Sequence, residues 1–314
     1  MNHPTAFIFP GQASQFPGMG RELTETFPEA RAVLAEAERA LGFSIGRLCF
    51  EGTSEELQLT EIAQPAILTV SMAAHAVLSA RGVRPQFVAG HSLGEYSAIV
   101  AAAGLSLADA VITVRKRGQY MQEAVPVGQG AMAALLGMPL DSVESLCREA
   151  AQGQVLEPAN LNSPVQIVIA GAAEAVGRAV QLAPQRGARR AIPLPVSAPF
   201  HCALMQPARE RLEKDLGQLQ FGDLQCPLVT NADAAAIHRG SDVAGALVRQ
   251  VCAPVRWSET IRFLRDRGVR RFVEVGPGRV LSGLVRQTDR SLEILNVEDL
   301  RSLDKTLAAL GAAG

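Results

Sequence analysis

The fold of this chain is decided by one stretch, Phe87-Val88-Ala89-Gly90-His91-Ser92-Leu93-Gly94. Residues 87–90 form a short apolar run that is typical of a buried strand. Residues 93–103 are mostly small and apolar, and they predict a helix that ends before Gly104. Because that helix is apolar on most faces, we expect it to lie at the centre of an α/β fold, packed on all sides.

Gly90-His91-Ser92-Leu93-Gly94 fits the pattern G-x-S-x-G at the junction of the strand and the helix. Such a turn exposes a serine hydroxyl, and glycine on each side of the turn lets backbone segments approach closely. Ser92 would lie at a helix N-terminus, where free N–H groups and the helix dipole stabilise an oxyanion. The pattern therefore indicates a nucleophilic serine, and the alternative is a serine that only caps the helix.

The same alternation of short apolar runs and helical stretches continues on both sides of this motif, with strands at 6–9 and 271–275 and helices at 28–41, 64–81 and 204–219. A different pattern follows from about residue 126, with strands at 131–136, 165–169 and 191–196 and helices at 141–151 and 172–185. This β-α-β-α-β order predicts a small inserted α+β domain. We expect one large discontinuous domain, residues 1–125 and 200–314, and a small domain, residues 126–199.

Composition excludes several classes of function. Lys and Arg number 30 against 31 Asp and Glu, and aromatic residues make up 4 %, so nucleic-acid binding is not expected. The five cysteines are scattered without a C-x-x-C pair, which argues against a disulfide framework and a zinc site. Residues 1–10 lack the basic region of a signal peptide, and the longest apolar run, around 98–103, is far shorter than a membrane span. We expect a cytoplasmic protein with no membrane segment.

A serine nucleophile needs a base, and five histidines are candidates. His3 lies near the N-terminus, His75 lies within an apolar helix, and His238 lies in a polar segment. The side chain of His91 should diverge from its neighbour Ser92. His201 remains, and it opens a predicted helix whose N-terminus disfavours the imidazolium form, which leaves a neutral imidazole able to accept a proton. The alternative is that this histidine merely begins a helix.

Further motifs are spread over nearly the whole chain. Their order and spacing resemble those of the malonyl-CoA:acyl-carrier-protein transacylase family, and they read Phe9-Pro10-Gly11-Gln12-Ala13-Ser14-Gln15, Gly90-His91-Ser92-Leu93-Gly94-Glu95-Tyr96, Gln122-Glu123-Ala124-Val125-Pro126, Asn162-Ser163-Pro164, Pro195-Val196-Ser197, His201-Cys202-Ala203-Leu204-Met205 and Glu274-Val275-Gly276-Pro277-Gly278. The resemblance implies an α/β-hydrolase-like core with a ferredoxin-like insertion and an active site in the cleft between them.

The resemblance also implies roles for individual residues. Ser92 would be acylated and His201 would be the general base. The backbone N–H groups of Gln12 and Leu93 would form the oxyanion hole. A backbone carbonyl at Gln250 would orient the histidine, so no third carboxylate is required.

The resemblance places the ligand for the substrate carboxylate at Arg117. The spacing of the predicted helix alone does not separate this residue from Arg115, since both flank its apolar face. The planar guanidinium would hold the free carboxylate of a malonyl group through two hydrogen bonds. The other positions implied to bind substrate are His91, Asn160, Asn162 and Phe200.

The implied reaction is ping-pong transfer of a malonyl group from malonyl-CoA to the phosphopantetheine thiol of acyl carrier protein, by a monomer without metal or other cofactor. Basic residues that could face an acidic carrier protein are Arg186, Arg189 and Arg190. The family usually has Gly at the position of Ala13, which matters if that position requires a positive φ. Two alternatives stay open: a hydrolase that uses Ser92 and His201, and a docking component without activity. The pathway, fatty-acid, polyketide or malonate-decarboxylase, does not follow from these residues.

One prediction concerns the choice of acyl group. Relatives that accept malonyl usually carry Phe directly before the histidine, as Phe200 stands here. Phe200→Ser should raise the use of methylmalonyl relative to malonyl thioesters, measured as the ratio of kcat/KM for the two donors. Unchanged selectivity would remove this side chain from the explanation.

Overall fold

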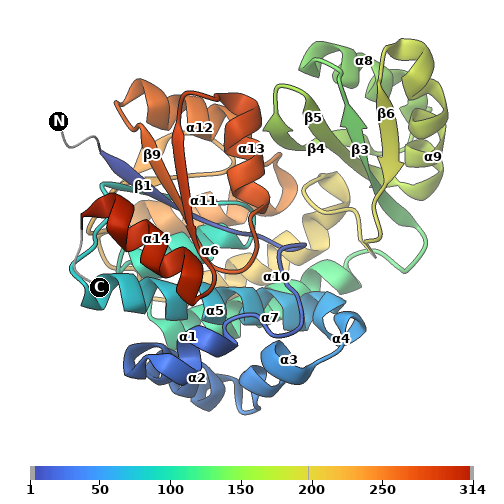
Figure 1. Ribbon diagram of the computed structural model, residues 1–314. Helices are drawn as coiled ribbons and strands as arrows, with labels where there is room; N and C mark the ends of the chain where they lie inside the picture. The colour runs from blue at the N-terminus through green and yellow to red at the C-terminus, as the bar shows by residue number, and fades with distance from the viewer. Residues whose placement is uncertain (1–3, 197, 312–314) are drawn as a thin grey trace.

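A computed structural model describes residues 4–196 and 198–311. The protein has a mixed α/β fold with two separate sheets, a large one at the centre and a small one in the unit drawn green to yellow beside it (Figure 1). The large sheet has the order β10-β9-β1-β2-β7-β8. Its strands are β1 (Thr5–Phe9), β2 (Phe87–Gly90), β7 (Leu228–Val229), β8 (Ala236–Ile237), β9 (Arg271–Val275) and β10 (Glu293–Val297). Neighbouring strands are parallel except β7 and β8, which pair antiparallel.

Helices cover both faces of the large sheet. They are α1 (Arg21–Thr26), α2 (Pro28–Leu41), α3 (Ile45–Glu51), α4 (Ser54–Gln58), α5 (Thr60–Ala80), α6 (Gly94–Ala101), α7 (Leu107–Glu123), α10 (Gln206–Leu216), α11 (Gly240–Cys252), α12 (Trp257–Asp266), α13 (Val280–Thr288) and α14 (Leu300–Leu310). Side chains alternate along β1, so successive residues face opposite sides of the sheet. Phe7 and Phe9 pack into the main core with α5 and α7, whereas Ala6 and Ile8 pack into a second core with α12 and α13.

The small sheet is antiparallel, with the order β4-β5-β3-β6. It contains β3 (Gly130–Leu136), β4 (Leu156–Ser163), β5 (Gln166–Ala172) and β6 (Arg190–Pro193), and it packs against α8 (Leu140–Ala151) and α9 (Ala173–Leu182) to form a core of its own. The structure contains one strand more than the expected order β-α-β-α-β, and the additional strand is β4. Residues 156–163 contain Pro158 and two asparagines, which disfavour a strand, and the pairing of β4 with β5 is interrupted by register shifts.

Backbone hydrogen bonds fasten the small sheet to the large unit. Leu161 N–H donates to Val255 O at 2.8 Å, and Val255 N–H donates to Ala159 O at 2.9 Å. Strand β4 also contacts α12 and α13. The two asparagines of β4 are therefore held at the junction of the two units, beside the Ser92 turn (residues 90–94).

Two expected helices differ from those observed. Helix α5 begins at Thr60, four residues before the expected start. It is long and apolar enough to cross a membrane by length and composition, but 78 % of its apolar window is buried inside the protein. The predicted helix 204–219 divides into a 3-10 turn, Ala203–Met205, and α10, which begins at Gln206. Strands β7, β8 and β10 and helices α1, α3, α4 and α11 to α14 were not expected from the sequence.

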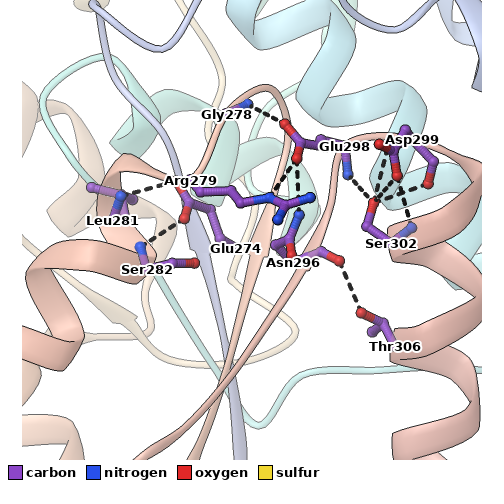
Figure 2. A network of polar contacts seen from close by, with 10 residues as sticks. All are labelled: Glu274, Gly278, Arg279, Leu281, Ser282, Asn296, Glu298, Asp299, Ser302 and Thr306. Atoms are coloured by element: carbon purple, nitrogen blue, oxygen red, sulfur yellow. Dashed lines mark hydrogen bonds and ion pairs between the residues drawn. The ribbon is translucent and has the colours of Figure 1, made fainter. Parts of the chain in front are cut away.

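The Gly276-Pro277-Gly278 turn after β9 is bordered by carboxylates (Figure 2). Glu274 accepts the N–H groups of Leu281 at 3.0 Å and Ser282 at 2.7 Å, so it occupies the free donors at the start of α13. Glu298 accepts Gly278 N–H at 3.1 Å and Arg279 Nε–H at 2.6 Å (Figure 2). These carboxylates hold a structural turn and take the donors that an anion would otherwise use.

The turn that follows β1 has one strained residue. Ala13 has a φ of 80°, in the left-handed region that a Cβ makes unfavourable. The neighbouring Gly11 has no room for a side chain, since a Cβ there would lie 2.4 Å from His91 O. Close contact with the Ser92 turn thus fixes the path of this loop and the strained conformation in it.

Ala13→Gly should raise the free energy of unfolding by about 1 kcal/mol, because relief of the left-handed strain exceeds the added entropy of the unfolded chain. Denaturant unfolding at constant m-value measures the change. Ala188→Gly is the matched control, in a loop where φ is not positive, and it should lower stability. A loss of stability in both variants would contradict the assignment of strain to Ala13.

Candidate active site

The Ser92 turn joins β2 to α6, and Ser92 itself has a φ of 52°. Glycine is required on both sides of it. A Cβ on Gly90 would lie 1.9 Å from Gly94 C, and a Cβ on Gly94 would lie 2.0 Å from Phe9 O. The backbone therefore turns in a space that only glycine permits, and the Ser92 side chain projects from the turn into the cavity between the two units.

Two amide side chains from distant parts of the sequence hold the backbone of Ser92. Ser92 N–H donates to Asn231 Oδ1 at 2.7 Å, and Asn231 Nδ2 donates to Gly90 O at 2.6 Å. Gln250 Nε2 donates to Ser92 O at 2.9 Å. Sequence reasoning missed Asn231, which lies two residues after the end of the two-residue strand β7 and is fully buried. An asparagine after so short a strand reads as an ordinary turn residue, so no sequence signal marked it.

His201 lies within hydrogen-bond distance of the serine. Its Nε2 is 2.7 Å from Ser92 Oγ, and its Nδ1 is 2.9 Å from Gln250 O. Because a carbonyl oxygen only accepts, Nδ1 carries the hydrogen, and the lone pair of Nε2 faces the serine hydroxyl. Burial, reinforced by the Arg117 guanidinium, lowers the pKa of His201 to about 3, so the imidazole is neutral near neutral pH.

The expectation that His201 opens the long helix is wrong. This residue has a φ of 62° and lies in a turn, and α10 begins only at Gln206, with Pro207 in its first turn. The neutral state of the imidazole therefore arises from burial and a neighbouring cation, and not from a helix dipole.

Arg117, on α7, is 2 % exposed and reaches the serine. Its Nη2 donates to Ser92 Oγ at 3.1 Å and to Gln250 Oε1 at 2.9 Å, and its Nη1 donates to Gln64 Oε1 at 2.8 Å. Arg115 lies elsewhere, with its guanidinium 4.8 Å from the ring centroid of Phe43. The structure thus separates two arginines that the helical pattern left equivalent.

The hydrogen-bond partners of Arg117 are all neutral. Among residues 4–196 and 198–311, no carboxylate lies within ion-pair distance of its guanidinium. Its Nε–H is buried and has no hydrogen-bond partner in the described part of the chain. A buried cation with neutral acceptors and a spare donor has the chemistry to bind an anion.

Two backbone N–H groups near the serine are free to donate. Those of Gln12 and Leu93 have no hydrogen-bond partner among the described residues, and Leu93 directly precedes the first turn of α6. Gln12 belongs to the loop that Gly11 holds against the Ser92 turn. Of the two residues expected in the oxyanion hole, Gln12 lines the cavity that contains Ser92, and Leu93 follows Ser92 directly in the chain.

That cavity has a volume of about 130 Å³ and contains both catalytic candidates and the guanidinium. It is lined by Gln12, Ala13, Gln64, His91, Ser92, Arg117, Met121, Met132, Asn160, Leu194, Val196, Phe200 and His201. Asn162 does not belong to this lining. It lies behind His91, whose Nε2 is 2.8 Å from Asn162 Oδ1 and whose ring packs against Trp257. The expectation that this asparagine lines the cleft is corrected to a contact that orients a lining residue.

The three arginines expected in a basic patch do not gather at the cavity. Arg186 forms an ion pair with Glu149, at 2.7 Å. Arg189 and Arg190 line a separate groove with Leu136 and Gln287. The groove lies at the start of β6, whereas the residues that follow the end of β6 line the cavity.

Loss of Asn231 should impair both stability and catalysis. Asn231→Ala would leave the N–H of Ser92 and the carbonyl of Gly90 without their partners, at a cost of about 1–3 kcal/mol in stability. We expect a similar cost in the acyl-transfer barrier, a loss of roughly ten- to a hundredfold in kcat. Urea unfolding and steady-state rates measure the two effects. Equal rates of the Asn231→Ala variant and wild type would refute the role.

Comparison with known proteins agrees with this geometry. The family model described as an acyl transferase domain matches residues 6–306. Malonyl CoA-acyl carrier protein transacylase of Bacillus subtilis is 47 % identical over 306 residues, which is 97 % of this chain and 96 % of that protein. The protein of the same name from Escherichia coli K12 is 45 % identical over 97 % of this chain and 98 % of its own length.

Solved structures resemble this one closely. The malonyl CoA-acyl carrier protein transacylase of Coxiella burnetii is 43 % identical with a TM-score of 0.96, covering 99 % of this chain and 98 % of that one. A malonyl-transacylase solved in complex with its type II polyketide synthase acyl-carrier protein is 44 % identical with a TM-score of 0.95, covering 98 % and 99 %. The chain therefore belongs to the malonyl CoA-acyl carrier protein transacylase family and is an acyltransferase.

Proposed function

We propose that this protein transfers a malonyl group from malonyl-CoA to the phosphopantetheine thiol of acyl carrier protein, through an ester on Ser92. The observation that carries the proposal is Arg117, a buried cation without a carboxylate partner whose Nη2 lies 3.1 Å from Ser92 Oγ. The names of the relatives, and the complex of one relative with its acyl-carrier protein, support the same donor and acceptor.

The first half of the reaction makes the ester. Ser92 Oγ attacks the thioester carbonyl as its proton passes to His201 Nε2. The C–S bond then breaks, and the sulfur of coenzyme A leaves with the bonding electrons and takes the proton from the imidazolium. In the second half, the carrier thiol gives its proton to His201 and attacks the ester carbonyl, and Ser92 Oγ regains a proton as it leaves. The two halves mirror each other, as ping-pong transfer requires.

The negative charge that forms on the carbonyl oxygen would rest on the N–H groups of Gln12 and Leu93. Both donors are part of the backbone, held in place by the glycine contacts of the Ser92 turn and the loop after β1. Gln250 O holds Nδ1–H of His201 and so keeps the lone pair of Nε2 toward the serine. Nucleophile, base and oxyanion donors all come from the chain, so the proposed transfer needs no metal or other cofactor.

Selection of the malonyl group would depend on Arg117. A malonyl carboxylate satisfies the buried guanidinium, whereas an acetyl group leaves its charge and its Nε–H without a partner. Phe200, Asn160 and His91 line the same cavity and would bound the acyl group. A hydrolase with the same serine and histidine would have no use for this cation, which favours transfer of a dicarboxylic acyl group.

The architecture of the two units supports the fold types that the family resemblance implies. A central parallel sheet with a serine between a strand and a helix supports an α/β-hydrolase-like core. The order β-α-β-β-α-β with an antiparallel sheet supports a ferredoxin-like small unit, residues 126–199. We further propose that the protein acts as a monomer in the cytoplasm.

The test is an intact-mass measurement after mixing with malonyl-CoA. Wild type should gain one malonyl group and Ser92→Ala none, and acetyl-CoA should label wild type far less. Arg117→Ala should lower malonylation by a hundredfold or more, the order expected from loss of a charged hydrogen-bonded pair, while acetylation falls much less. Arg115→Ala, on the same helix, is the matched control and should keep the preference for malonyl.

Addition of carrier protein should then move the label from Ser92 to the carrier thiol. Release of free malonate in its place would establish the hydrolase alternative. Absence of any adduct and any turnover would leave a docking component without activity.

A further inference from the structure

Glu95 is a fully buried carboxylate in the first turn of α6, three residues after the nucleophile, and the reaction steps above do not use it. Its Oε2 accepts Asn231 N–H at 3.0 Å and Gln250 Nε2–H at 2.9 Å. Its Oε1 is buried without a hydrogen-bond partner among the described residues. One oxygen is thus saturated with donors, and the other has its lone pairs free to take a proton.

A single amide connects this carboxylate to the guanidinium. Gln250 Oε1 accepts Arg117 Nη2–H at 2.9 Å, and Gln250 Nε2 donates to Glu95 at the other end of the same side chain. Arg117 and Glu95 form no direct ion pair, yet each affects the ionisation of the other through the buried medium between them. In the empty site the carboxylate of Glu95 is therefore the nearby negative charge that balances Arg117.

The neighbouring His201, His91 and Tyr96 keep their charge state near neutral pH. Burial lowers the pKa of His201, in the turn before α10, and the pKa of His91, in the Ser92 turn, so both are neutral there. Burial raises the pKa of Tyr96, beside it on α6, so the phenol stays protonated. Asp233, in the turn after β7, is paired with Arg249 of α11 at 2.7 Å near the surface.

We propose that binding of the acyl carboxylate to Arg117 is coupled to uptake of one proton from solvent by Glu95 Oε1. The proposal rests on the proposed function, in which that carboxylate belongs to malonyl. Before binding, the buried pair consists of the guanidinium and the ionised Glu95. After binding, it consists of the guanidinium and the substrate carboxylate, with Glu95 neutral. The net charge of the buried site is then zero in both states, which avoids a second uncompensated anion in the interior.

The direction of the pH dependence follows from the ionisation of Glu95. Burial raises the pKa of Glu95 to about 7 in the empty site, and a second anion on the same guanidinium raises that pKa further. Below about pH 6 the group is protonated before and after binding, and no proton is taken up. Between the two pKa values binding takes up a proton, so affinity for the malonyl donor falls as pH rises, by up to about tenfold per unit.

Calorimetric titration of Ser92→Ala with malonyl-CoA tests the coupling, because this variant binds the donor without being acylated. Titrations at pH 7.5 in two buffers of different ionisation enthalpy give the number of protons taken up. We expect uptake of up to about three-quarters of a proton per site with malonyl-CoA, because a pKa of about 7 leaves about a quarter of the empty sites already protonated at pH 7.5. Acetyl-CoA, which carries the same phosphates, should cause no uptake. A pH series should place half of the maximal uptake near pH 7, far above the range in which His201 titrates.

Two further variants in the Ser92→Ala background identify the group. Adding Glu95→Gln should abolish the uptake and flatten the pH dependence of affinity. Adding Glu274→Gln should leave both unchanged. Glu274 is the matched control, since it is also fully buried with its pKa raised to about 7, but its oxygens accept the N–H groups of α13.

The outcomes separate this proposal from the proposed function. Preference for malonyl-CoA without proton uptake, or uptake that persists in Glu95→Gln, would overturn the coupling and leave the transfer reaction standing. Equal affinity for malonyl-CoA and acetyl-CoA would overturn the role of Arg117, and the coupling with it. If Glu95→Gln does not fold, the proton uptake of Ser92→Ala and its pH dependence still test the coupling, because that variant retains Glu95.

Discussion

The active site is organised around the guanidinium of Arg117, which is buried without a carboxylate bound to it. An isolated charge in a protein interior costs several kcal/mol unless polar groups surround it. Here the surroundings are Gln64 from α5, Gln250 from α11 and the hydroxyl of Ser92, with the Tyr96 ring 5.7 Å from the guanidinium carbon. Three helices and the catalytic turn must therefore converge on one side chain of α7. The arrangement buries the cation and leaves it without a carboxylate partner, as the proposed binding of a malonyl carboxylate requires.

The same constraint explains why amides, rather than acids, support the catalytic groups. A carboxylate that oriented His201 would stabilise the imidazolium and compete as a partner for Arg117. A backbone carbonyl at Gln250 fixes the tautomer of the histidine without adding a charge. Asn231 and the Gln250 side chain fix the Ser92 backbone in the same neutral way. Among the residues that the structure describes, Glu95 alone brings a negative charge into this network, and one amide separates it from the guanidinium.

Local patterns predicted the parts of this fold that local chemistry determines. Helix α2 runs from Pro28 to Leu41 as expected, because proline favours the first turn and Gly42 adopts the left-handed conformation at its end. Strand β2 was predicted because its residues form an apolar run. The turn at Ser92 was predicted because two glycines at this spacing indicate close contact between backbone segments.

Features that depend on distant contacts could not be predicted in this way. Strand β4 contains Pro158 and polar residues, and its place is set by pairing with β5 and by the bridge to Val255. Asn231 matters through two hydrogen bonds to a turn 139 residues earlier, which no local signal records. The choice between Arg115 and Arg117 depends on which neighbour each side chain meets, and helical spacing gives both the same face.

The order of the catalytic groups along the chain has a consequence for synthesis. The small unit is inserted between Ser92 and His201, which are 109 residues apart in the chain. Asn231 and Gln250 lie later still. Bringing residues so far apart in the chain into contact costs conformational entropy. Pairing of the last strands of the large sheet offsets that cost. In the proposed mechanism, a nascent chain that has emerged as far as α7 contains the serine and the arginine but not the base His201, so it cannot yet carry out the transfer.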